Sequence, residues 1–144
     1  MQIFEMKEAD VSSVHEIERM IFSKPWSEKS FLDSLLDDKN IYLVAKEDDE
    51  LVGYCGLWSV MDEGYITNVA VKPNYQGKGI GKAMLLKLLD IGKKKGILAF
   101  TLEVRVGNLV AIKLYKNLGF VEAGVRKDFY EDPVEDGLIM WLNC

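Results

Sequence analysis

Hydrophobic positions along the chain fall into two kinds of pattern. Four stretches repeat apolar residues every three or four positions, which is the spacing of one helix face. Seven others are apolar runs or alternate apolar with polar residues, as strands do. We therefore predict helices at 11–21, 27–36, 80–95 and 108–118. We predict strands at 2–6, 40–46, 51–60, 65–71, 97–106, 120–125 and 138–142.

The order of these elements indicates a mixed α/β fold. The second and third strands are separated by the acidic turn Glu47-Asp48-Asp49-Glu50, which is typical of a β-hairpin. From residue 65 to residue 125 strands alternate with helices, and such crossover units favour a locally parallel sheet. No repeat, low-complexity tract or linker divides the chain, so we expect one domain over residues 1–144.

Composition and charge narrow the function classes. With 144 residues, 49% of them hydrophobic, the chain can bury a core of its own. The 18 Lys and Arg against 23 Asp and Glu give a net charge of −5, which argues against direct nucleic-acid binding and suits an amine substrate. No apolar run approaches the roughly 18 residues of a membrane span, and the acidic start lacks a signal-peptide pattern, so we expect a cytoplasmic protein without membrane contact. One His and two distant Cys predict no metal site.

A glycine cluster connects the strand at 65–71 to the following helix. In Gln76-Gly77-Lys78-Gly79-Ile80-Gly81-Lys82, backbone N–H groups and a helix N-terminus converge, which predicts a phosphate site. Two better-known phosphate loops do not fit. A P-loop needs Gly at position 76 and Ser or Thr at position 83, and a dinucleotide loop needs Gly at position 82. A tight turn into a helix, without any ligand, is the alternative interpretation.

The residues around this cluster resemble the acyl-CoA-binding motif of the GNAT superfamily of N-acetyltransferases. The motif begins at Gln76 and follows the strand residues Val69-Ala70-Val71. Three further runs, Pro25–Lys29, Leu102–Arg105 and Asn108–Phe120, are similar to the ribosomal-protein-alanine N-acetyltransferase branch of that superfamily. The resemblance implies the GNAT fold, a splayed mixed sheet of about seven strands flanked by about four helices.

The resemblance also implies an activity. The chain would be an acyltransferase with acetyl-CoA as cosubstrate, acting on the N-terminal α-amino group of a protein by direct attack through a tetrahedral intermediate. In the similar branch that acceptor is the N-terminal alanine of a small-subunit ribosomal protein. We expect acetyl-CoA and this protein N-terminus as partners of a monomer. A small-amine or other peptide acetyltransferase on the same fold and a non-catalytic CoA-binding module remain alternatives.

Within the resemblance, the cofactor-binding residues follow the motif. Backbone groups of Val69 and Ala70 would pair with pantetheine as a strand does, and the N–H of Val71 would donate to the thioester carbonyl. The glycine loop would hold the phosphates. Asn108 would contact pantetheine, although it also stands where a helix N-cap belongs. The full set is Val69, Ala70, Val71, Gln76, Gly77, Lys78, Gly79, Ile80, Gly81, Lys82 and Asn108.

Two residues would transfer protons. Glu103 is the only carboxylate of the strand segment 99–104, where it either faces solvent or lies in a cleft, and the resemblance implies that it is the proton acceptor. An α-amino group, with a pKa of about 8, needs only a weak base. By composition Tyr115 would be a core aromatic beside Leu114 and Leu118, but the resemblance implies that its hydroxyl protonates the departing thiolate.

The acceptor peptide would lie between two segments that are far apart in the sequence. The resemblance implies Trp26 and Glu28 on one side and Tyr130 on the other as substrate-binding residues. Phe129 stands where the branch has a second Tyr, and Gly137 where it has Ala. These two departures bear on specificity for alanine.

Overall fold

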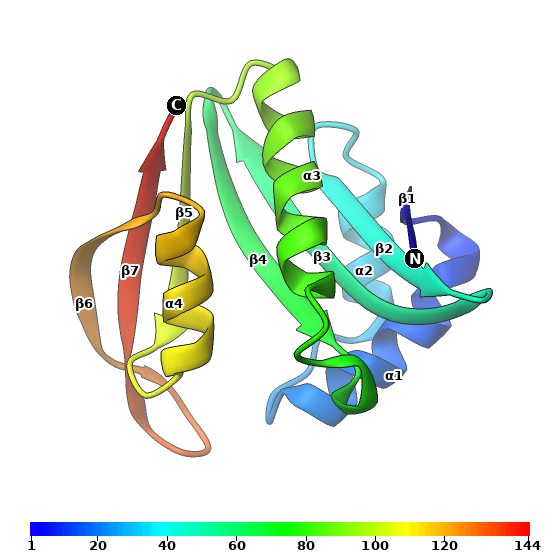
Figure 1. The fold of residues 1–144 in the computed structure, drawn as a ribbon, viewed down its shortest axis with the longest axis horizontal. Coiled ribbons are helices and arrows are strands. Elements are labelled where there is room, and N and C mark those ends of the chain that lie inside the picture. The colour runs from blue at the N-terminus through cyan, green and yellow to red at the C-terminus, as the bar shows by residue number, and fades with distance from the viewer.

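Residues 1–144, described in full by a computed structural model, form one seven-stranded sheet with helices on both faces (Figure 1). The strands are β1 Gln2–Glu5, β2 Ile41–Glu47, β3 Glu50–Val60, β4 Glu63–Val71, β5 Ala99–Arg105, β6 Val121–Tyr130 and β7 Glu135–Asn143. The helices are α1 Val11–Ile21, α2 Glu28–Leu35, α3 Ile80–Lys94 and α4 Leu109–Asn117, with 3-10 turns at Glu8–Asp10 and Pro73–Tyr75. None of the helices combines the length and the apolar character that a membrane-spanning segment requires.

The centre of the sheet holds its one parallel pair. In the strand order β1-β2-β3-β4-β5-β7-β6, β4 and β5 are neighbours, but they pair only between Glu63–Tyr65 and Ala99–Thr101. Beyond these residues the two strands diverge, and Figure 1 shows the separation widening toward the end of β4. The facing backbone edges of β4 and β5 therefore lack a strand partner over the second half of β4.

Two hydrophobic cores hold the helices against the sheet. Helices α3 and α4 cover one face (Figure 1), and Leu85 of α3, Phe100 of β5 and Met140 of β7 are fully buried between helices and sheet. Helices α1 and α2 cover the opposite face through a smaller core that includes Ile17 and Phe31. Because each helix has only one apolar stripe, this burial sets which face of each helix meets the sheet.

A β-bulge in β4 decides which side chains face which core. Consecutive residues of β3 pair with Ile66 and Asn68, so Thr67 is the extra residue. Ile66 and Ala70 are four positions apart and would share a face in a regular strand. Instead, Ile66 packs in the core under α3 and Ala70 in the core under α1. The bulge thereby turns Asn68 toward the α1 face.

All eleven predicted helices and strands are confirmed, and the last hairpin differs most in its bounds. Strand β6 continues to Tyr130, beyond the predicted end at residue 125, and β7 begins at Glu135 rather than at residue 138. Nearly all of β6 is exposed, so it lacks the apolar alternation from which strand ends are predicted. The parallel expectation holds for β4 and β5 only. Strands β5 and β6 run in the same direction, but β7 lies between them and is antiparallel to both.

Candidate active site

A cleft of about 950 Å³ opens where β4 and β5 separate. It is lined by both strands, by the starts of α3 and α4, by the loop between α1 and α2, and by the loop between β6 and β7. We call the part next to α3 and α4 the α3 side, and the part next to the α1–α2 and β6–β7 loops the α1 side. Because the sheet is open here, one cleft reaches both of its faces.

The glycine cluster lies on the α3 side, between β4 and the start of α3. Gly77 and Gly79 have positive φ angles of 78° and 82°, a conformation that L side chains rarely adopt. A Cβ atom at either position would meet nothing within 4 Å, so the surface above them is open. No backbone N–H from Gly77 to Lys82 donates a hydrogen bond within the protein. This row of free donors at a helix start can hold an anion such as phosphate.

Two more backbone donors, on β4, point into the splay. Successive N–H groups of a strand alternate in direction, and the N–H of Lys72 donates to the Val52 carbonyl on β3 at 2.8 Å. The N–H groups of Val71 and Val69 therefore point the other way, toward the edge that β5 has left. The side chains of both valines pack in the core under α3. The backbone faces the cleft and the side chains stabilise the fold.

Tyr115 of α4 belongs both to the core and to the cleft wall. It is 8% exposed and packs edge-on against Phe120 with ring centroids 5.9 Å apart. Burial, with a smaller contribution from Tyr130, raises the pKa of this phenol above its ordinary 10.0, so it stays protonated near neutrality. At the start of the same helix the Oδ1 atom of Asn108 accepts the N–H of Ala111 at 3.2 Å, so Asn108 is an N-cap that also lines the cleft.

Glu103 of β5 faces the cleft, not solvent. Its side chain is 7% exposed, Oε1 pairs with Nε of Arg126 at 3.2 Å, and Oε2 accepts the hydroxyl hydrogen of Tyr65. Burial and this hydrogen bond raise the pKa of Tyr65, which remains a donor. A carboxylate has about four acceptor positions, so Glu103 can still hold a water molecule or an amine.

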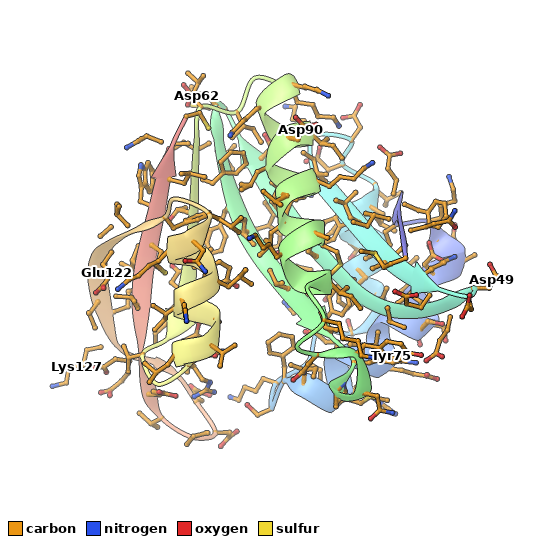
Figure 2. All side chains as sticks on the ribbon, viewed as in Figure 1. Asp49, Asp62, Tyr75, Asp90, Glu122 and Lys127 are labelled. Carbon is orange, nitrogen blue, oxygen red and sulfur yellow. The ribbon has the colours of Figure 1, made fainter.

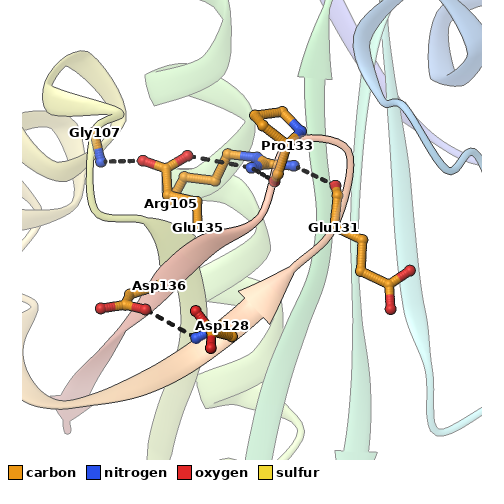
Figure 3. Close-up of polar contacts among 7 residues, drawn as sticks. All are labelled: Arg105, Gly107, Asp128, Glu131, Pro133, Glu135 and Asp136. Atoms are coloured by element: carbon orange, nitrogen blue, oxygen red, sulfur yellow. Dashed lines mark hydrogen bonds and ion pairs between the residues drawn. The ribbon is translucent and has the colours of Figure 1, made fainter.

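The β6–β7 loop on the α1 side is held in place by Arg105 (Figure 3). The guanidinium donates to the carbonyl of Glu131 at 3.0 Å, to the carbonyl of Pro133 at 2.9 Å and to the carboxylate of Glu135 at 3.2 Å. It also lies over the ring of Tyr130, 4.5 Å from the centroid. The loop that follows Tyr130 is therefore ordered by one side chain of β5.

Tyr130 lies in the cleft wall and packs against Phe129. Its ring meets Phe129 edge-on, with centroids 5.0 Å apart, and burial together with Glu103 raises its pKa to about 12. A Cβ atom at Gly137 would stand 3.1–3.3 Å from atoms of Phe129. Phe129 and Gly137, the two departures noted in the sequence, thus fit one another.

Trp26 enters the α1 side from the loop before α2. The side chain of Ser27 caps this helix by accepting the N–H of Ser30 at 3.1 Å. The ring of Trp26 stacks on Trp58 with centroids 5.6 Å apart, and its backbone N–H donates to Oε2 of Glu18 at 2.8 Å. The loop is therefore fastened to α1 and to β3.

Two residues expected in the site do not line the cleft. The carboxylate of Glu28, in the first turn of α2, lies 3.9 Å from Nδ1 of His15 on α1, and this residue is not part of the cleft wall. The ammonium of Lys78 lies over the ring of Tyr75, 5.2 Å from its centroid, and Figure 2 shows Tyr75 below the start of α3. The other predicted cofactor, catalytic and acceptor residues all line it.

Comparison with known proteins identifies the family. The model of the acetyltransferase (GNAT) family matches residues 11–120. The chain belongs to the GNAT family. A Bacillus subtilis protein, provisionally named a ribosomal protein bS18-alanine N-acetyltransferase, is 43% identical over 139 residues, which are 96% of this chain and 92% of that protein. The crystal structure of the ribosomal-protein-S18-alanine N-acetyltransferase from Escherichia coli matches with a TM-score of 0.91 and 34% identity, covering 99% of this chain and 92% of that one.

Another solved GNAT structure contains the cofactor. The PaiA N-acetyltransferase from Thermoplasma acidophilum, in complex with coenzyme A, matches with a TM-score of 0.83 and 25% identity over 99% of this chain and 98% of that one. In this GNAT chain the cleft offers a row of free N–H groups, two donors on β4 and the hydroxyl of Tyr115. These groups fit the phosphates, the pantetheine and the sulfur of acetyl-CoA, respectively. The predicted GNAT fold is confirmed by these matches and by the seven-stranded splayed sheet.

Four polar residues in or next to this GNAT cleft were not singled out from the sequence: Glu18, Asn68 and Arg105 line it, and Tyr65 donates to Glu103. Glu18 carries a signal that could have found it, since it stands four positions after Val14 and therefore on the apolar face of α1. The others carry no such signal, because alternation along a strand cannot locate a bulge or a partner on another strand.

Proposed function

We propose that this GNAT chain moves the acetyl group of acetyl-CoA to the N-terminal α-amino group of a protein, and that its acceptor is the N-terminal alanine of a small-subunit ribosomal protein. The observation that carries the proposal is a single cleft that opens to both faces of the sheet. Its α3 side presents Tyr115 and N–H groups that can bind an anion, and β5 contributes Glu103. The names of the relatives at 43% and 34% identity support the acceptor. We further propose that the protein is a cytoplasmic monomer. Its net charge of −5 suits a protein N-terminus with basic neighbours.

The proposal gives the α3 side the task of holding acetyl-CoA, whose thioester supplies the activated acetyl group. The free N–H groups from Gly77 to Lys82, together with the positive end of the α3 dipole, bind the phosphates. The N–H of Val69 binds pantetheine. The N–H of Val71 donates to the thioester oxygen and stabilises the negative charge that develops there during attack.

Two side chains would handle protons. Glu103 accepts the proton of the attacking amine, directly or through one water molecule that its free lone pairs hold. The hydroxyl of Tyr115 donates a proton to the departing thiolate. Burial raises the pKa of Tyr115, so its hydroxyl keeps the proton before the reaction, and the thiolate that leaves into the same desolvated cleft is a stronger base there than it is in bulk water.

The acceptor class is tested by incubating the protein with acetyl-CoA and a panel of acceptors. The panel contains peptides with free N-termini, matched peptides with a blocked N-terminus and an internal lysine, and polyamines. Mass spectrometry locates the acetyl group. We expect the label on the α-amino group, with alanine first in the peptide as the best acceptor. Faster acetylation of lysine side chains or polyamines than of every N-terminus would exclude the proposal in favour of a small-amine acetyltransferase.

A further inference from the structure

The α1 side of the cleft contains a buried polar cluster for which the proposed function has no role. The carboxylate of Glu18 is at its centre, in a residue that is 2% exposed. Its Oε2 accepts a hydrogen bond from the backbone N–H of Trp26 at 2.8 Å. Its Oε1 accepts hydrogen bonds from the hydroxyl of Tyr54 and from Nδ2 of Asn68, the latter at 3.4 Å. A buried carboxylate needs such donors. The cluster connects α1 to the α1–α2 loop and to β4.

Asn68 is the member of this cluster that has hydrogen-bonding capacity left. It is 4% exposed, lies in the cleft wall, and its Oδ1 atom is buried without any hydrogen-bond partner in the protein. Glu18 sets which end of the amide is free, because rotating the amide by half a turn would place Oδ1 against a carboxylate oxygen. A buried carbonyl oxygen without a donor lowers the stability of the folded state. A ligand N–H that donates to this oxygen would recover the lost hydrogen-bond free energy.

We propose that Asn68 binds the acceptor by taking a hydrogen bond on Oδ1 from an N–H of its N-terminal residue, and that Glu18 is the positioning residue that orients Asn68. The inference rests on the proposed function, and it adds a specificity determinant to it. A polypeptide N-terminus carries donors both on its amino group and on its first peptide N–H. Asn68 and Glu103 line the same cleft from the two strands of the splay, so an acceptor held by one can reach the other.

The first test is Asn68→Ala, with steady-state kinetics on the best peptide acceptor of the wild-type protein. The KM for the peptide should rise about tenfold, the change expected when one hydrogen bond in a desolvated site is lost. The KM for acetyl-CoA should stay at its wild-type value, whereas the thermal midpoint should fall somewhat, because the variant also removes the N–H that Asn68 donates to Glu18. An unchanged peptide KM, or an equal rise of both KM values, would overturn the inference.

The variant Glu18→Gln tests whether Glu18 orients Asn68 or only stabilises the fold. Gln keeps an oxygen for the N–H of Trp26, but its NH₂ group cannot accept the NH₂ group of Asn68, which is then free to rotate. The peptide KM should rise as in Asn68→Ala, and the double variant should show no further rise. Additive rises would mean that Glu18 acts independently of Asn68 and would contradict the positioning role.

Tyr54→Phe is the matched control, since it removes a donor to the same carboxylate from a residue that does not line the cleft. It should lower the thermal midpoint and leave the peptide KM unchanged. A rise in peptide KM equal to that of Asn68→Ala would mean that the cluster only supports the fold and would contradict the inference. Should the wild-type protein acetylate no peptide N-terminus, the proposed function and this inference both fail. Should it acetylate peptides while Asn68→Ala keeps the wild-type KM, only this inference fails.

Discussion

The two sides of the cleft are built in different ways. On the α3 side the donors are backbone groups from one continuous segment, residues 69–82. On the α1 side the polar groups are side chains from α1, β4, β5 and the β6–β7 loop, and each is held by a partner on another element. Substitutions on the α3 side should therefore change the use of acetyl-CoA, and substitutions on the α1 side should change the use of the acceptor. Tyr115 is the exception, a side chain on the α3 side that acts on the reaction itself.

Tyr115→Phe should have the largest effect. The ring and its contact with Phe120 remain, but the proton for the thiolate is lost. We expect kcat to fall by roughly 10²-fold or more while the binding of acetyl-CoA, measured by calorimetry, changes little. Tyr42→Phe is the control, because it removes another largely buried phenol hydroxyl, one that contacts Thr67 at 3.4 Å and belongs to a residue outside the cleft wall. Wild-type kcat in Tyr115→Phe would assign this tyrosine to the core alone.

Glu103→Gln tests the proton acceptor through the pH dependence of the rate. With an N-terminal alanine peptide we expect a loss of roughly tenfold near pH 6.5, where the amine is mostly protonated and needs a base. The loss should shrink as the pH rises past about 8, because the amine then loses its proton without help. A loss of the same size at every pH would show that Glu103 orients the peptide or a water molecule and does not take the proton.

Gly79→Ala tests the backbone cradle on the α3 side. The positive φ of 82° makes any L side chain there costly, by about 1–2 kcal/mol of stability. Gly96→Ala is the matched control at the other end of α3, with a φ of 94° and equally open space. Both variants should lower the free energy of unfolding by similar amounts. Only Gly79→Ala should raise the KM for acetyl-CoA, by about fivefold, since only its methyl group disturbs the phosphate site.

The smallest effect should come from the ion pair that joins the α1–α2 loop to the β6–β7 loop. Lys24 and Glu131 both line the cleft, and both are well exposed, so their pairing is weak in energy. Lys24→Gln frees the carboxylate of Glu131 and should lower the KM for a peptide with basic residues after alanine by about twofold. Glu131→Gln should raise it by a similar factor.

Salt separates this effect from a change in loop shape. Both shifts should fade as ionic strength rises from about 0.05 M to about 0.5 M, because salt screens exposed charges. Lys94→Gln, which breaks the exposed pair with Asp90 on α3, should change neither KM value. Shifts in KM that persist at high salt would point to the position of the loops and not to charge.

Much of the α3 side could be predicted from the sequence because its chemistry is local. Alternate glycines between a strand and a helix dictate a turn with positive φ, and the first turn of any helix leaves its N–H groups free. The residues of this segment alone are therefore enough to predict that the backbone around Gly77 and Gly79 can bind an anion. The element order likewise follows from apolar periodicity, which is a property of each segment alone.

The α1 side was decided by tertiary structure. The sequence contains Glu18, Asn68 and Arg105, but not the bulge at Thr67 that turns Asn68 toward α1, nor the loop that Arg105 holds. It also could not show that Glu28, in the first turn of its helix, points away from the cleft. Each of these features depends on contacts between different helices, strands or loops, and the residue pattern within one segment carries no record of such contacts. Each chain segment specifies its own secondary structure. The contacts between side chains of four segments form only because β4 and β5 pair over three residues and then diverge.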